Sequence, residues 1–200
     1  MCGILVYKNK GNNFYIQKRG QDLTNKLERG GFTFIHNLLH VTGKLTPQPY
    51  VDDNIICLYN GEIYNHKFVR CDGENIIPLY KKYGSDFPKY LDGEWAIALY
   101  DFSKNIALFA TDLFASKPLW RKGLECASYE SGVGGRKIPA NTIEIVHFDG
   151  KEESKKIIDW DLNQHKDTYD DWISAFEKAV KKIAYYYGLP SGEVFDELSI

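Results

Sequence analysis

Short segments rich in β-branched and aromatic residues recur along the chain, and they constrain its fold more than any other feature. Gly, Pro, Asn and Asp separate them, which is the pattern of strands joined by turns. The expected strands are 3–8, 14–18, 32–41, 55–59, 94–100, 106–111, 118–120, 125–129 and 142–148. We expect the first two to form a hairpin across 9–13, and 94–100 to pair with 106–111. Many strands with few helices favour two packed sheets.

One helix is expected after Asp72, whose side chain can cap a helix that begins near Gly73 and stops at Gly84. Pro78 should kink or shorten this helix, because proline removes an interior hydrogen bond. A second short helix is expected at 86–91.

The best-defined helix follows Thr168-Tyr169-Asp170-Asp171, which has the form of a capping box. An apolar stripe at helical spacing comes next, and Gly188 and Pro190 are placed to end the helix. The stripe consists of Trp172, Phe176, Ala179, Val180, Ile183 and Tyr187.

Composition excludes several classes of function. The 200 residues carry a formal net charge of -2 with Lys and Arg scattered, which argues against a nucleic-acid partner. Neither a membrane span nor a signal peptide is visible, so we expect a cytoplasmic location. The four cysteines include no C-x-x-C pair, and His36 and His40 lack the helical setting and the Glu of a zinc motif. We therefore expect no metal and no cofactor.

The chain opens with Met1-Cys2-Gly3-Ile4, which makes Cys2 a candidate nucleophile. Removal of the initiator Met would leave Cys2 with a free α-amino group of pKa about 7.7 to 8.0, beside a thiol of pKa about 8.5. Such an amine can take the proton of the thiol. The alternative is that Cys2 is a small buried hydrophobic residue, the usual role of a free cysteine.

Six segments occur in the order and approximate spacing of one family. They are Met1-Cys2-Gly3-Ile4, Arg19-Gly20-Gln21-Asp22, Tyr59-Asn60-Gly61-Glu62-Ile63-Tyr64-Asn65, Asp72-Gly73-Glu74, Leu91-Asp92-Gly93 with Trp95-Ala96, and Lys117-Pro118-Leu119. With them the chain resembles the class II glutamine amidotransferase domain, most closely that of the glutamine-dependent asparagine synthetases. The resemblance implies the N-terminal nucleophile hydrolase fold, an α+β sandwich with four layers (αββα) in which helices cover two packed antiparallel sheets.

The resemblance also implies a role for each site residue. Cys2 would attack the amide of glutamine, and the side-chain amide of Asn60 and the backbone N–H of Gly61 would stabilise the oxyanion. Asp72, with Gly73 beside it, would hold the substrate α-ammonium, and Glu62 would lie near the same end of the substrate. Two alternatives stay open: Asn60-Gly61 as an ordinary turn between strands, and Asp72 as a helix cap only.

Two positions depart from the family pattern. Gln21 replaces a proline in a turn that is mostly structural, and Leu38 stands where the family has an arginine that grips the substrate α-carboxylate. Either another cation such as Lys44 or Arg29 substitutes, or the substrate is an amide without that carboxylate, or the site is degenerate.

The resemblance divides the chain into a glutamine amidotransferase domain at 2–160 and a helical extension at 161–200 that is similar to the start of a synthetase domain. The Ser-Gly-Gly-x-Asp-Ser loop that binds ATP pyrophosphate in such domains does not occur. We expect a separate ATP-dependent synthetase subunit to use the ammonia and the apolar stripe to help dock it. Alternatively, the stripe packs on the chain's own sheet.

Three functions follow from these residues. The first is a glutaminase subunit that makes glutamate and ammonia through a thioester on Cys2. The second is a hydrolase with an N-terminal cysteine that acts on another amide. The third is a binding or regulatory domain that keeps the fold without catalysis.

Overall fold

The computed structural model describes residues 1–41, 43–161 and 167–187. The chain divides into two compact units, Met1–Ile158 and Asp159–Ile200. The first unit contains both sheets, and the second contains one long helix.

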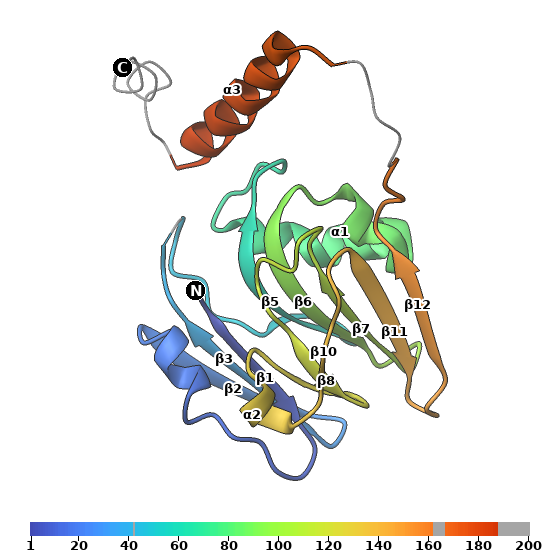
Figure 1. Ribbon diagram of the computed structural model, residues 1–200. Coiled ribbons are helices and arrows are strands. Elements are labelled where there is room, and N and C mark those ends of the chain that lie inside the picture. Colours follow the sequence, from blue (N-terminus) through green and yellow to red (C-terminus); the bar gives the residue numbers. More distant parts are fainter. Residues whose placement is uncertain (42, 162–166, 188–200) are drawn as a thin grey trace. The chain divides into compact units, whose positions relative to one another are not determined.

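Two antiparallel sheets of six strands each form the first unit (Figure 1). In spatial order, the first sheet consists of β10 (Arg136–Lys137), β8 (Trp120–Lys122), β9 (Glu125–Ala127), β1 (Gly3–Tyr7), β3 (Phe32–Leu38) and β2 (Leu23–Arg29). The second sheet consists of β12 (Glu152–Lys156), β11 (Thr142–His147), β7 (Ile106–Thr111), β6 (Gly93–Asp101), β5 (Ile55–Ile63) and β4 (Tyr50–Asp52).

Side chains alternate between the two faces of each central strand, and this alternation gives rise to the layers. Ile4 and Val6 of β1 pack with Ile56 and Leu58 of β5, and these side chains belong to the core between the sheets. The other face of β5 packs against α1 (Ile76–Tyr83). On the first sheet, residues of η1 (Ile16–Arg19) and α2 (Glu130–Val133) cover the outer face (Figure 1). The expected four-layer α+β sandwich is therefore confirmed.

The expected hairpin between 3–8 and 14–18 is wrong. Residues Ile16–Arg19 form a 3-10 helix, and β1 pairs with β3 and β9 instead. The expected strands also omit β2, β4, β10 and β12. The longest of these is β2, whose sequence LTNKLER is mostly exposed. Because β2 lies at the edge of its sheet, it needs few apolar residues, and its composition therefore gives little strand signal.

The helix after Asp72 is present but is not capped by that residue. A 3-10 turn, η2 (Asp72–Asn75), leads into α1, and neither element has a side-chain cap. Pro78 lies in the first turn of α1, where its missing N–H has no partner within the helix, so it is tolerated. The expected helix at 86–91 is also a 3-10 helix, η3 (Gly84–Tyr90).

The capping box before the long helix is confirmed. In α3 (Tyr169–Tyr186) the Thr168 side chain accepts a hydrogen bond from the Asp171 N–H, and the Asp171 side chain accepts one from the Thr168 N–H. The expected stop signals Gly188 and Pro190 lie outside the described residues.

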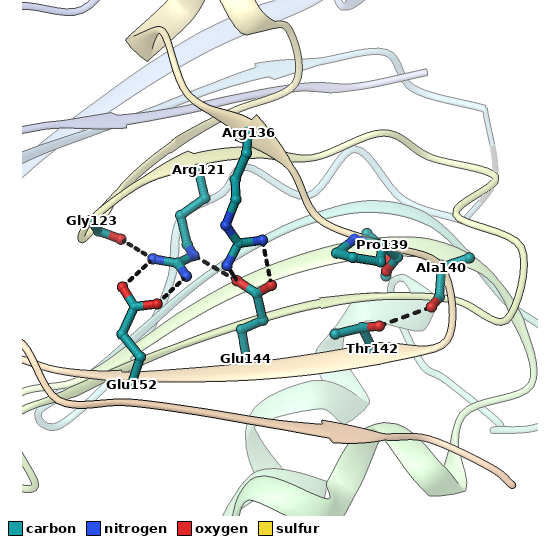
Figure 2. A network of polar contacts seen from close by, with 9 residues as sticks. Arg121, Gly123, Arg136, Pro139, Ala140, Thr142, Glu144 and Glu152 are labelled. Atoms are coloured by element: carbon teal, nitrogen blue, oxygen red, sulfur yellow. Dashed lines mark hydrogen bonds and ion pairs between the residues drawn. The ribbon is translucent and has the colours of Figure 1, made fainter.

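A network of charged side chains links the two sheets (Figure 2). Arg121 on β8 donates to Glu144 on β11 at 2.6 Å and to Glu152 on β12 at 2.9 and 2.8 Å. Arg136 on β10 donates to the same Glu144 carboxylate at 2.7 and 3.0 Å. Because the side chains of Arg121 and Glu144 are only 3% and 5% exposed, neither can exchange its partner for water.

Glu144→Gln is expected to lower the free energy of unfolding by about 1.5 to 3 kcal/mol, because Arg121 and Arg136 both lose the charge of their shared partner and Arg121 keeps only the half-exposed Glu152. Urea denaturation measures this change. The matched control is Glu153→Gln, which removes a carboxylate from an exposed pair with Lys151 and should leave the free energy of unfolding nearly unchanged. Equal changes in the free energy of unfolding from the two substitutions would show that the network does not hold the two sheets together.

Candidate active site

Cys2 lies immediately before β1, at an alternate position to Ile4 and Val6 and therefore on the same face of the strand. Since side chains alternate along a strand, this register directs the Cys2 side chain toward the interface between the sheets. The thiol Sγ lies 3.7 Å from the Leu39 carbonyl oxygen, within reach of a weak S–H···O bond. Cys2 is thus held at the edge of the core, where a substrate can reach it.

A pocket opens at Cys2 and is bordered by three segments far apart in the sequence. The lining residues are Cys2, Leu38–Val41, Lys44, Thr46, Gln48, Tyr50, Tyr59, Gly61, Glu62, Cys71 and Asp72. The structure therefore brings four of the expected site residues to one pocket: Cys2, Gly61, Glu62 and Asp72. Asn60 and Gly73 are not among its lining residues.

Asn60 is 1% exposed, and its side-chain amide has no hydrogen-bond partner among the described residues, at either the nitrogen or the oxygen. It lies on β5 in the register of Ile56 and Leu58, so its side chain points into the interface that Cys2 also faces. Leaving a buried amide unpaired costs about 1 to 3 kcal/mol. Such an amide is available to a group that enters from outside.

Tyr59, the residue before Asn60, is held at three atoms. Its N–H donates to the Gln48 side chain at 2.7 Å, its carbonyl oxygen lies 3.2 Å from His36 Nε2, and its hydroxyl donates to the Asp72 carboxylate. These partners come from three different segments, and they fix the main chain of β5 directly before Asn60.

The Gly61 N–H faces the pocket side of β5. Backbone groups alternate between the two edges of a strand, and the N–H groups of Tyr59 and Ile63 both bond on the edge opposite β6, to Gln48 and Asp72. Gly61 lies between them. A Cβ at Gly61 would lie 2.1 Å from the Glu94 carbonyl oxygen, so only glycine fits. Because β5 continues through Ile63 and pairs with β6, the alternative of an ordinary turn is wrong.

Asp72 has a different role from the expected cap. Its carboxylate accepts hydrogen bonds from the Ile63 N–H at 2.7 Å and from the Tyr59 hydroxyl, and it is 5% exposed. A Cβ at Gly73 would lie 2.7 Å from the Tyr50 hydroxyl oxygen, so Gly73 permits close packing behind the pocket. Asp72 therefore presents a fixed negative charge at the pocket wall.

The two cations considered as substitutes for the family arginine lie in different places. Lys44 lines the pocket together with Leu38. Arg29 bonds to the Asp53 carbonyl and the Asn54 side chain and lies over the Phe102 ring, away from the pocket lining. The expectation that Arg29 could substitute is therefore wrong.

The turn at Arg19 fastens the N-terminus. Arg19 Nε donates to the Cys2 carbonyl oxygen at 3.0 Å, and its guanidinium lies over the Tyr129 ring. Asp22 accepts a hydrogen bond from the His40 N–H at 2.7 Å, which holds the pocket wall. The turn therefore positions both Cys2 and the segment opposite it.

Burial and local charges set the ionisation of the N-terminus. Burial raises the pKa of the Cys2 thiol above its usual value. The hydrogen bond to the Leu39 carbonyl and the terminal ammonium oppose this increase, and the charges of Glu62 and Asp72 add to it. Burial also lowers the pKa of the terminal ammonium from 8.0, with Arg19 and Lys117 lowering it and Cys2 and Glu62 opposing them. The thiol is thus protonated at neutral pH, next to an amine that loses its proton easily.

Sequence reasoning missed Tyr59, Gln48 and His36 as positioning residues. Burial lowers the pKa of His36 to about 4, so its ring is neutral and Nε2–H can donate to the Tyr59 carbonyl. Among the described residues, no cluster of three His, Cys, Asp or Glu side chains could hold a metal ion. Within the same residues, no helix has both the length and the apolar character to cross a membrane.

Comparisons with known proteins point to one family. A sequence profile described as a glutamine amidotransferase domain matches residues 1–132. The inferred asparagine synthetase 1 (glutamine-hydrolysing) of Methanocaldococcus jannaschii is 38% identical over 106 residues, which cover 46% of this chain and 19% of that protein. Asparagine synthetase 1 (glutamine-hydrolysing) of Saccharomyces cerevisiae is 34% identical over 137 residues, which cover 56% and 24%. The chain thus matches a quarter or less of the length of these relatives.

A similar fold occurs in a solved structure, the glutamine phosphoribosylpyrophosphate amidotransferase of B. subtilis complexed with ADP and GMP. The TM-score is 0.52 with 17% sequence identity, and the match covers 81% of this chain and 43% of that chain. At this low sequence identity the similarity is evidence of a shared fold and of nothing more.

Proposed function

The chain belongs to the glutamine amidotransferase domain family, and from this premise we propose that it hydrolyses glutamine or a related small amide with Cys2 as the nucleophile. One observation carries the proposal. Cys2, the pair Gly61 and Glu62 on β5, and Asp72 come from three separate segments and line a single pocket, as a thiol-dependent amide hydrolysis requires.

In the proposed reaction the Cys2 thiolate attacks the amide carbon, and the carbonyl oxygen becomes an oxyanion. The Asn60 Nδ2–H and the Gly61 N–H stabilise this negative charge, which is the largest single contribution in many acyl transfers. The carbon–nitrogen bond then breaks, and the leaving nitrogen takes a proton to become ammonia. Water attacks the resulting thioester, and the acid product and the free thiol are released.

The terminal amine acts as the base in this proposal. After removal of Met1 the amine would belong to Cys2 itself, where burial and the charges of Arg19 and Lys117 would continue to lower its pKa. It can then take the thiol proton and later deliver it to the leaving nitrogen. A lowered pKa supports this role because the amine must be neutral to accept a proton.

The pH dependence tests the base. We expect kcat/KM to fall as pH falls through the pKa of the Cys2 amine, which the same burial and cations would lower, because a protonated amine cannot accept the thiol proton. Lys117→Met removes a positive charge that lowers this pKa, so the acid limb of the profile should move to higher pH by roughly 0.5 to 1 unit. Lys117→Arg keeps the charge and should leave the limb in place. An identical limb in all three proteins would exclude the amine as the base.

A second candidate substrate class is an amide without an α-carboxylate. The observation that favours it is the buried Leu38 side chain, an apolar group in the pocket wall. Both candidates use the same nucleophile and oxyanion donors, and they differ only in how the far end of the substrate is bound.

We also propose that an ATP-dependent synthetase uses the ammonia, as the similarity to asparagine synthetases suggests. The region 161–200 would then correspond to the start of a synthetase domain, and the Trp172 to Tyr187 stripe of α3 would dock this partner on a separate polypeptide. Affinity purification of the full chain, followed by mass measurement of the complex, tests this arrangement. Recovery of a stable monomer without a partner would contradict it.

The experiment that tests the central proposal is an assay of ammonia release from glutamine. It requires protein whose intact mass shows that Met1 has been removed, with Cys2→Ala assayed in parallel. Activity that depends on Cys2 is the expected result.

A further inference from the structure

The charges in the pocket lining are unevenly distributed. Glu62 and Asp72 supply negative charge, and among the described lining residues Lys44 is the sole Lys or Arg. Apolar side chains from the end of β3 and the segment after it, Leu38, Leu39 and Val41, form another part of the wall. An α-carboxylate that enters such a pocket loses water, which costs free energy unless a cation pairs with it.

The main chain at Lys44 is fixed beside the segment that carries the Asp72 carboxylate into the pocket wall. The Lys44 N–H donates to the Arg70 carbonyl oxygen at 2.6 Å, two residues before Asp72. A Cβ at the neighbouring Gly43 would lie 2.2 Å from the same oxygen, so this segment packs closely against the 70–72 segment. The Lys44 ammonium itself has no hydrogen bond or ion pair among the described residues.

Building on the proposed amide hydrolysis, we propose that the Lys44 ammonium binds the α-carboxylate of the substrate. The substrate class is then a free α-amino acid with a side-chain amide, whose ammonium end lies toward Glu62 and Asp72. Leu38 contributes an apolar contact to this site and no charge.

A lysine in this position has a measurable consequence. An ammonium is a compact point charge on a flexible stem and lacks the two-pronged geometry with which arginine binds a carboxylate. Carboxylate recognition here therefore depends on charge more than on the geometry of the side chain. Lys44→Arg should keep most of it, whereas Lys44→Met should lose it.

The test compares glutamine with 4-aminobutanamide, which is glutamine without its α-carboxylate. Lys44→Met should lower kcat/KM for glutamine by about tenfold or more, mainly through KM, because a charged hydrogen bond is lost. It should leave kcat/KM for 4-aminobutanamide within about twofold of the unaltered protein. Lys10→Met removes an exposed lysine outside the pocket lining, and it should change neither value.

The outcomes separate this inference from the function on which it depends. If Lys44→Met leaves the ratio of the two kcat/KM values unchanged while ammonia release still requires Cys2, the inference is overturned and the proposed function stands. A preference of the unaltered protein for 4-aminobutanamide over glutamine would also overturn it. If neither amide gives Cys2-dependent ammonia, the proposed function itself fails.

Discussion

Cys2→Ala is expected to reduce ammonia release from glutamine by on the order of 10⁴- to 10⁶-fold, because removal of a nucleophile eliminates the covalent route altogether. The fold should be unaffected, since Cys2 is only partly buried and makes one weak side-chain contact, to the Leu39 carbonyl. Steady-state ammonia assays and thermal unfolding of the same preparations measure both effects.

A matched control distinguishes loss of the nucleophile from loss of a thiol in general. Cys126→Ala removes a buried thiol on β9 that lies outside the pocket lining. It should reduce stability modestly through the small cavity that it leaves, and turnover per folded molecule should persist. Ammonia release that survives Cys2→Ala would rule out the thioester mechanism, and retention of Met1 in an active protein would rule out the amine of Cys2 as its base.

The central strands were predictable because their signal is local. In β5, β6 and β7 runs of apolar residues are buried on both faces, and such runs stand out in a sequence. The edge strand β2 and the 3-10 helix η1 were not predictable in this way. Phe14 and Tyr15 look like strand residues, yet their side chains are 57% and 54% exposed, and tertiary context decides against a strand.

The site was predictable where chemistry requires a specific residue type. Cys2, Gly61, Glu62 and Asp72 could be named from motifs, and the structure brings them to one pocket. The partners that hold Tyr59 could not be named from the sequence. Nothing in the sequence around a buried His or a loop Gln shows which atoms the side chain will contact. In the same way, only the fold distinguishes Lys44 from Arg29, since both are single cations of unremarkable context.

Asn60 and Asn37 are two buried asparagines with opposite hydrogen-bond states. Asn37 is 0% exposed; its side chain donates to Asn13 at 2.9 Å and accepts from Thr24 at 2.9 Å. The Asn60 amide is buried to a similar degree and has no partner among the described residues. An unpaired buried amide destabilises the folded chain, so it persists only where something other than stability requires it. In the proposed reaction the developing oxyanion would be such a requirement.

Asn60→Leu, which replaces the amide with an apolar group of similar shape, is therefore expected to raise the free energy of unfolding by about 1 to 3 kcal/mol. It should also lower kcat by about 10²- to 10³-fold, because one oxyanion donor is lost. Asn37→Leu is the matched control, and it should lower stability by a similar amount because Asn13 and Thr24 lose a partner. Urea unfolding and ammonia release measure the two effects. A destabilised Asn60→Leu protein would mean that this amide is paired in solution, and unchanged turnover would exclude it from the oxyanion site.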